Sequence, residues 1–170
     1  MLLYTAANCK SSNLCLGKVN LVLDRGADVD LTDGRYGTAL GTAAYQGKLG
    51  IVTLLLGHVN LTGGNYGTAL GAAAFIFGQL EAVILLLDRG ANVNLTGGDY
   101  GTALGVAAYR GELETVILRL GPGADVNLTG GGYGTALGAA AYGGKLETVK
   151  LFFDRGANPD LMNNKGARPG

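Results

Sequence analysis

The sequence Tyr-Gly-Thr-Ala-Leu-Gly occurs four times, and this repetition limits the fold more than any other feature of the chain. The copies begin at Tyr36, Tyr66, Tyr100 and Tyr133, so successive copies are 30, 34 and 33 residues apart. A period near 33 residues is typical of supersecondary units that stack on one another. The chain is therefore expected to fold as a short array of stacked units.

Two apolar segments follow each copy, and their spacing predicts a pair of short helices in every unit. In the earliest complete copy, Leu40, Ala43 and Ala44 recur at i, i+3 and i+4, which places them on one face of a helix over 38–46. Thr38 stands where its side chain would cap the start of this helix. Each unit is thus expected to begin with a capped helix that buries small side chains.

A second helix and a tight loop complete the predicted unit. Segment 80–89 predicts a helix that ends where Gly90 adopts a left-handed conformation, and the corresponding helix of the first unit is expected over 19–25. Between units, the sequence Asn-Leu-Thr-Gly-Gly-x-Tyr-Gly predicts a projecting hairpin, because paired glycines allow a tight reversal of the chain.

These residues resemble the ankyrin repeat. The match rests on Gly-Thr-Ala-Leu-Gly-x-Ala-Ala followed by Gly-x-Leu-Glu-x-Val-x-Leu-Leu-Leu-Asp-Arg-Gly-Ala-Asn-Val-Asn, and it covers nearly the whole chain in four consecutive copies. The Tyr-Gly-Thr-Ala-Leu variant is most similar to repeats of fungal ankyrin proteins. The resemblance implies an all-α ankyrin-repeat solenoid of helix-turn-helix units with projecting β-hairpins, comprising about four complete units and partial ends.

The ends of the array are expected to be incomplete. Repeat arrays usually need polar capping units, yet Phe152 and Phe153 lie in the last complete unit. We therefore expect either a longer natural product or self-association through the uncapped ends. The predicted division places the array in 1–160, with units at about 1–30, 31–60, 61–94, 95–127 and 128–160, and assigns 161–170 to the truncated hairpin of a further repeat.

The repeats depart from the family pattern Thr-Pro-Leu-His in composition and in length. Glycine in place of the family's histidine costs about 1 kcal/mol relative to alanine inside a helix, unless it lets the first helices pack closely enough to offset that cost. The turn that contains His58 has lost three residues, and Ile76 is an insertion. The four glycines are Gly41, Gly71, Gly105 and Gly138.

Composition excludes several classes of function. Lysine plus arginine equals aspartate plus glutamate at 13 each, so no field of one sign attracts nucleic acid or an anionic membrane. Apolar runs fall short of the ~20 residues of a membrane span, and the first residues do not form a secretory signal. We expect an intracellular, cytoplasmic protein in which Cys9 and Cys15, in an irregular region, are unpaired thiols.

Candidate catalytic and ligand-binding groups are each better explained by the repeats. His58 is the only histidine, so it is interpreted as a solvent-exposed loop residue rather than a catalytic base. The segment 143–146 resembles the end of a phosphate-binding loop, but leucine replaces the hydroxyl residue that would hold magnesium. The three Asn-Leu-Thr triplets match a glycosylation signal but are one repeated segment. No catalytic residue, cofactor or metal is expected.

Recognition of a partner is expected at positions that differ between units. The residues before the repeated tyrosines vary at the hairpin tips, whereas the tyrosines themselves are assigned to the scaffold. The resemblance implies that hairpins and first helices form a concave binding surface and that the positions after Ala-Ala vary. Aromatic residues and arginine predominate at binding hot spots, which favours Tyr109 and Arg110 as the centre. An equally weighted interpretation is that Tyr45, Tyr109 and Tyr142 only cover helix ends. The candidates are Arg35, Asn65 and Asp99 at the tips, and Tyr45, Gln46, Phe75, Phe77, Tyr109, Arg110 and Tyr142 on the first helices.

The sequence therefore predicts a non-catalytic module that binds a protein partner, with no role for nucleic acid, membrane, cofactor or metal. The alternative is a structural spacer or regulatory arm of a larger multidomain protein, because the units are nearly identical and the ends uncapped. An enzyme is a remote third hypothesis that rests on His58 alone.

Overall fold

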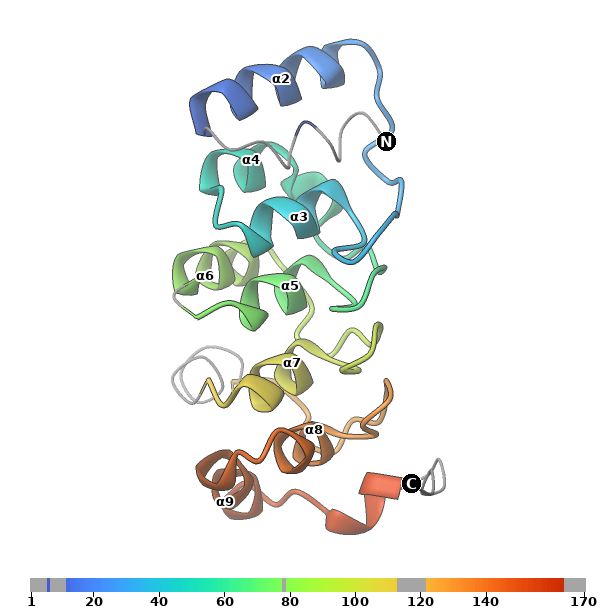
Figure 1. Ribbon diagram of the computed structural model, residues 1–170, viewed down its shortest axis with the longest axis vertical. Coiled ribbons are helices and arrows are strands. Elements are labelled where there is room, and N and C mark those ends of the chain that lie inside the picture. Colours follow the sequence, from blue (N-terminus) through green and yellow to red (C-terminus); the bar gives the residue numbers. More distant parts are fainter. Residues whose placement is uncertain (1–5, 7–11, 78, 113–121, 164–170) are drawn as a thin grey trace.

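A computed structural model describes residue 6 and residues 12–77, 79–112 and 122–163. The chain stacks helices in two rows along one axis (Figure 1). In the second, third and fifth units, in which both helices are described, the two helices pack as a pair, and from the second unit on the first helix of each unit packs on that of the next. This arrangement confirms the all-α solenoid predicted from the period. The first helices are α3 (Ala39–Tyr45), α5 (Ala69–Phe75), α7 (Ala103–Arg110) and α8 (Ala136–Tyr142), and the second helices are α2 (Ser12–Asp24), α4 (Leu49–Leu54), α6 (Leu80–Asp88) and α9 (Leu146–Asp154).

The first helices begin where the threonine of each copy predicts. The hydroxyl of Thr38 accepts a hydrogen bond of 2.9 Å from the backbone N–H of Gly41, and Thr38 is itself buried. The same cap recurs in the three later units. Each cap satisfies a donor of the first turn that would otherwise lack a partner. The repeated threonine therefore fixes where each first helix starts.

Small side chains allow the first helices to stack closely. The alanine pairs of α3, α5 and α7 are at most 2 % exposed, and one leucine in each first helix is at most 3 % exposed. Because alanine loses no side-chain entropy on burial, a narrow layer of these residues is a stable core. The leucines are Leu40, Leu70, Leu104 and Leu137.

Glycine at the third helical position is required by the loop that precedes each first helix. A Cβ atom at Gly105 would overlap the carbonyl oxygen of Tyr100, and the other three helical glycines meet the tyrosine of their own unit in the same way. The glycine therefore lets the hairpin fold back onto its helix. This contact within a unit, more than closer packing between helices, explains why the family's histidine position is occupied by glycine.

Replacing this glycine is expected to destabilise the array although alanine has the higher helix propensity. Gly105→Ala should lower the free energy of unfolding by about 1–3 kcal/mol because of the overlap with Tyr100. Gly17→Ala, in α2 with nothing within 4 Å of the new Cβ, should instead raise it by up to about 1 kcal/mol. Urea denaturation followed by circular dichroism distinguishes the two. Equal stabilisation by both variants would contradict the packing argument.

The loops between units are tight turns rather than paired strands. The backbone N–H of Gly97 donates to the carbonyl of Gly101 over 2.7 Å, and each of the four loops repeats this bond. The second glycine of each pair has a positive φ, for example 66° at Gly98. Within the described residues only Thr62 and Thr68 form an antiparallel bridge. The predicted hairpins are thus present as projecting loops, which Figure 1 shows along one side of the stack.

The asparagine side chain of each Asn-Leu-Thr triplet joins its unit to the next unit. Asn94 donates from Nδ2 to the carbonyl of Gly123 over 2.8 Å and accepts from the backbone N–H of Asp125 over 2.8 Å. Asn60 and Asn127 make the same two bonds to the following unit. The amide nitrogen of the Asn-Leu-Thr triplet is therefore used inside the array, which explains the recurrence of asparagine without glycosylation.

The first junction is built differently because the turn around His58 is three residues shorter. Asp30 occupies the position of the joining asparagine, and His58 Nδ1 lies 2.5 Å from Asp30 Oδ1. Here α4 ends at Leu54 and a 3-10 turn covers Leu56–His58. His58 is exposed, as predicted, but it pairs with Asp30 and links two units, which the sequence did not indicate.

Three predictions for the first unit are wrong, namely the start of its second helix, the irregular setting of Cys15 and the unpaired thiol of Cys15. The second helix begins at Ser12 rather than at residue 19, because Cys15 and Val19 are one turn apart and both completely buried. Cys15 therefore lies in α2 rather than in an irregular region, and it is disulfide-bonded. Cys9 lies outside the described residues.

Candidate protein-interaction surface

The variable hairpin-tip positions form a continuous row, here called the tip row: Arg35, Asn65, Asp99 and Gly132. All four residues are exposed. The backbone N–H of Asn65 donates to the carbonyl of Arg35 over 2.7 Å, that of Asp99 to Asn65 over 2.8 Å, and that of Gly132 to Asp99 over 2.7 Å. Because these bonds use the backbone alone, the side chains can differ between units without disturbing the stack.

Close contact between glycines brings the tips together. A Cβ at Gly101 would lie 2.5 Å from the carbonyl oxygen of Gly130 in the next unit, and Gly67 meets Gly97 in the same way. Gly101 also has a φ of 80°, which L side chains rarely adopt. The repeated Tyr-Gly therefore serves the contact between neighbouring loops.

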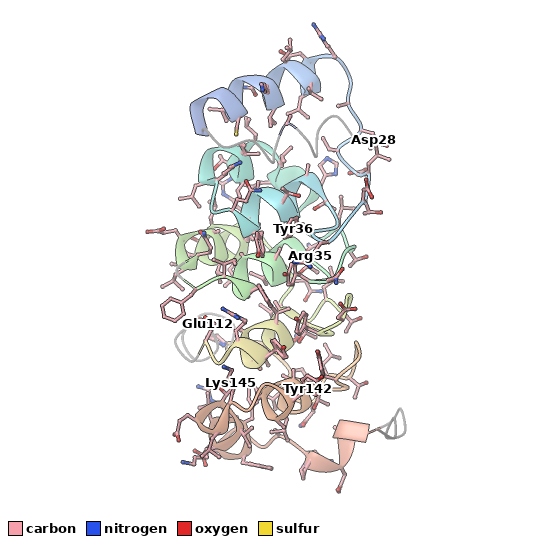
Figure 2. All side chains as sticks on the ribbon, viewed as in Figure 1. Asp28, Arg35, Tyr36, Glu112, Tyr142 and Lys145 are labelled. Atoms are coloured by element: carbon pink, nitrogen blue, oxygen red, sulfur yellow. The ribbon has the colours of Figure 1, made fainter. Side chains whose placement is uncertain are left out.

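Eight aromatic rings run beside the tip row and form what is here called the aromatic ladder. Each unit contributes a tyrosine from the loop and a ring from the end of the first helix, with centroids 4.3 to 5.0 Å apart. Rings of adjacent units follow at 5.5 to 6.3 Å. Figure 2 shows its first and last members, Tyr36 and Tyr142, between the helices and the loops. The loop rings are Tyr36, Tyr66, Tyr100 and Tyr133, and the helix rings are Tyr45, Phe75, Tyr109 and Tyr142.

The ladder combines packing with exposure. Tyr66 is 4 % exposed, whereas Tyr142 is 72 % exposed, and the other six rings are half-buried. Stacked and tilted ring pairs at these distances contribute about 0.5–1.5 kcal/mol each beyond area burial. Tyr45, Tyr109 and Tyr142 therefore cover helix ends and also keep some exposed surface, and their contact with a partner stays a prediction. The loop tyrosines, assigned to the scaffold, belong to the same surface.

Burial keeps three of the ladder hydroxyls protonated. It raises the pKa values of Tyr66, Tyr100 and Tyr133 above the ordinary tyrosine value, and neighbouring tyrosines add to the effect. The negative charge of Asp99 raises the pKa values of both Tyr100 and Tyr133, whereas the positive charge of Arg35 partly offsets the rise at Tyr66. These three loop tyrosines are thus neutral, and the tip row beside them carries a cation at Arg35 and an anion at Asp99.

Arg110 covers one ring of the ladder. Its guanidinium carbon lies 4.9 Å from the ring centroid of Phe75 in the preceding unit, which is a cation–π contact. Gln46 follows α3, and its backbone N–H donates to the carbonyl of Thr42. The inserted Ile76 has extended backbone angles and ends α5, so that Phe77 is 81 % exposed. Of the candidate helix residues predicted from the sequence, Tyr45, Phe75, Tyr109 and Tyr142 therefore belong to the ladder and Arg110 contacts it.

The C-terminal helices expose apolar side chains. Leu146 is 63 % and Phe153 is 51 % exposed, but Phe152 is 1 % exposed, so the expectation of an uncovered end fits Phe153 and is wrong for Phe152. Self-association through this end stays a prediction.

Among the residues that the structure describes, no group of three or more histidine, cysteine, aspartate or glutamate side chains is placed to hold a metal ion. Across residues 12–77, 79–112 and 122–163, no helix is both long and apolar enough to cross a membrane.

Two family models match this sequence. A model of three ankyrin repeat copies matches residues 3–97, and a single ankyrin repeat matches 134–164. The chain belongs to the ankyrin repeat family. The ankyrin segment between these matches contains α7, which has the same threonine cap at Thr102 and packs between α5 and α8. No curated protein matches the sequence.

Membership in the ankyrin repeat family fits the arrangement of the surface. Ankyrin repeats are generally protein–protein interaction modules and are generally non-catalytic. In this ankyrin array the tip row and the aromatic ladder lie side by side along the stack, and together they are called the ladder face below.

Proposed function

We propose that this chain is a non-catalytic module that binds a protein partner along the ladder face, through the hairpin tips and the first-helix side. The observation that carries the proposal is the half-exposed aromatic ladder beside a tip row whose side chains differ in every unit. Tyrosine and arginine are the residues most enriched at binding hot spots. A partner that covers several units could bury the ~800 Å² per side of an ordinary interface.

The centre of the proposed surface is Tyr109 with Arg110. Tyr109 contacts three rings, those of Tyr100, Tyr133 and Tyr142. A rigid, partly exposed ring with few free torsions loses little entropy on binding. Arg110 is exposed and held over Phe75, so its charge is already positioned before a partner arrives.

A pull-down with matched variants tests this function. Tyr109→Ala combined with Arg110→Glu should reduce capture of the partner from a lysate of the source organism at least about tenfold, because two hot-spot side chains together exceed 1.4 kcal/mol. The control combines Leu54→Ala with Lys150→Glu at exposed positions of α4 and α9. Circular dichroism verifies that both variants fold.

The two possible failures have different meanings. If the control variant loses the partner and the ladder variant keeps it, the binding surface lies on the second helices. If both variants capture the same proteins as the intact chain, the spacer or regulatory-arm interpretation replaces the binding module.

A further inference from the structure

The first unit is joined to the second by contacts unlike those of the later junctions. At the later junctions an asparagine side chain makes two hydrogen bonds to the next unit, whereas here the ion pair between Asp30 and His58 takes their place. Both side chains of this pair are exposed, so water and salt weaken their attraction. The attachment of the first unit therefore depends strongly on how its helix α2 is held.

The sequence of α2 gives this helix little stability of its own. Gly17 lies in its interior, its first turn has no acidic residue and its last turn has no basic residue. Glycine is among the poorest helix formers, and the missing end charges are those that stabilise a helix through its dipole. The helix relies on packing instead: Cys15 and Val19 are completely buried, and α2 packs on α4 at one end of the stack (Figure 1).

Cys15 combines a disulfide bond with a contact to the second unit. It is disulfide-bonded, and Lys48 Nζ donates a hydrogen bond of 3.5 Å to its Sγ. Lys48 immediately precedes α4, so this contact crosses the junction between the first and second units. Burial lowers the pKa of Lys48 below the ordinary lysine value, because its charge is partly withdrawn from water. A cation that water screens less interacts more strongly with an anion beside it.

The position of Lys48 favours Cys15 as the leaving sulfur when the disulfide bond is reduced. A positive charge beside a cysteine stabilises its thiolate, and a sulfur that is more stable as a thiolate leaves faster. Because Cys15 is completely buried, an external thiolate attacks the other sulfur of the bond. The electron pair of the broken S–S bond goes to Cys15 Sγ, beside the Lys48 ammonium. A dithiol completes the exchange: it is oxidised to a disulfide, and its two electrons and two protons reduce both sulfurs of the chain.

We infer that the disulfide bond of Cys15 is a redox-sensitive clasp, which a dithiol opens with the assistance of Lys48 and which, once open, loosens α2 from α4. The first unit of a solenoid has only one neighbour, so the loosening is confined to that end of the array. Helix α2 contributes no residue to the ladder face, and the inference is therefore independent of the proposed function.

The oxidised and reduced forms of the intact chain provide the first test. Alkylation with iodoacetamide in urea, followed by mass spectrometry, counts the free thiols: the oxidised chain should have none, and the chain treated with dithiothreitol should have two. Hydrogen exchange of the folded chain should then show that amide exchange in α2 rises about tenfold on reduction, because the clasp no longer holds the helix. Exchange in α8 and α9 should stay unchanged.

Matched lysine variants test the part played by Lys48. Lys48→Gln should slow reduction by dithiothreitol about three- to tenfold, because the Cys15 thiolate loses its neighbouring cation. Glutamine suits this position, since Gln79 takes the same place before α6. Lys48→Arg keeps the charge and should be reduced at close to the original rate. Lys145→Gln changes the equivalent position before α9 and should have no effect.

Three results would overturn the inference. They are two free thiols that persist after incubation with oxidised glutathione, unchanged amide exchange in α2 on reduction, or equal reduction rates for the intact chain and Lys48→Gln. Because none of these measurements involves a partner, the proposed function would survive any of them.

Discussion

Gly101→Ala is expected to lower the free energy of unfolding by about 3–4 kcal/mol, a large loss for the addition of a single methyl group. The left-handed backbone at Gly101, with a φ of 80°, accounts for about 1–2 kcal/mol of strain once a side chain is present. The rest arises between units, because the new Cβ would lie 2.5 Å from the carbonyl oxygen of Gly130. Relieving that overlap would pull the loop away and weaken the bond between Gly132 and Asp99.

Gly90→Ala is the matched control for this substitution. Gly90 has a similar φ of 85°, but nothing lies within 4 Å of its added Cβ. It should therefore cost only the conformational strain, about 1–2 kcal/mol. Denaturation of both variants in urea measures the difference. Equal losses would show that contact between neighbouring loops contributes nothing.

Asn94→Ala is expected to give the second largest loss, about 2 kcal/mol. Asn94 makes two hydrogen bonds to the next unit, one to the carbonyl of Gly123 and one from the N–H of Asp125. Each such bond contributes about 0.5–1.5 kcal/mol. Because solenoid units are stabilised by their nearest neighbours, the loss should be concentrated at one junction. Hydrogen exchange should therefore rise most in the loops around residues 92–99 and 122–127.

Asn92→Ala distinguishes bonds between units from bonds within a loop. The side chain of Asn92 accepts one bond of 2.9 Å from the backbone N–H of Asn94, two residues away. Its loss should cost about 1 kcal/mol or less. If this variant were as destabilising as Asn94→Ala, the asparagine side chain would not join the units.

Local features of the fold were predictable from the sequence and features that cross between units were less so. The threonine caps and the left-handed Gly90 depend on residues within one turn, and both are confirmed. The start of α2 was missed because Cys15 was read as part of an irregular region, although it lies one turn before Val19. The pairing of His58 with Asp30 was missed because it replaces a bond made by asparagine at the later junctions.

The candidate surface could be predicted only in part, because some of its contacts are formed between units. The variable tips could be identified because Arg35, Asn65 and Asp99 occupy the same repeat position and differ, whereas the Tyr-Gly-Thr-Ala-Leu-Gly that follows is identical in each copy. The loop tyrosines were set aside as scaffold because they do not vary, yet they stack on the helix rings and share the surface with them. The sequence does contain a signal for this stacking, because an aromatic residue recurs at the same two positions in each of these four units. The contact of Arg110 with Phe75 joins two units, and the periodicity of the sequence does not predict which side chains meet across that junction.

Site-specific photo-crosslinking tests the central claim that the partner lies on the ladder face. A benzophenone-bearing amino acid would replace Tyr142 on the ladder in one protein and Leu54 on the second-helix side in another, since both side chains are substantially exposed. The account predicts a covalent adduct with one protein from position 142 and none from position 54. An adduct from position 54 without one from position 142 would contradict it.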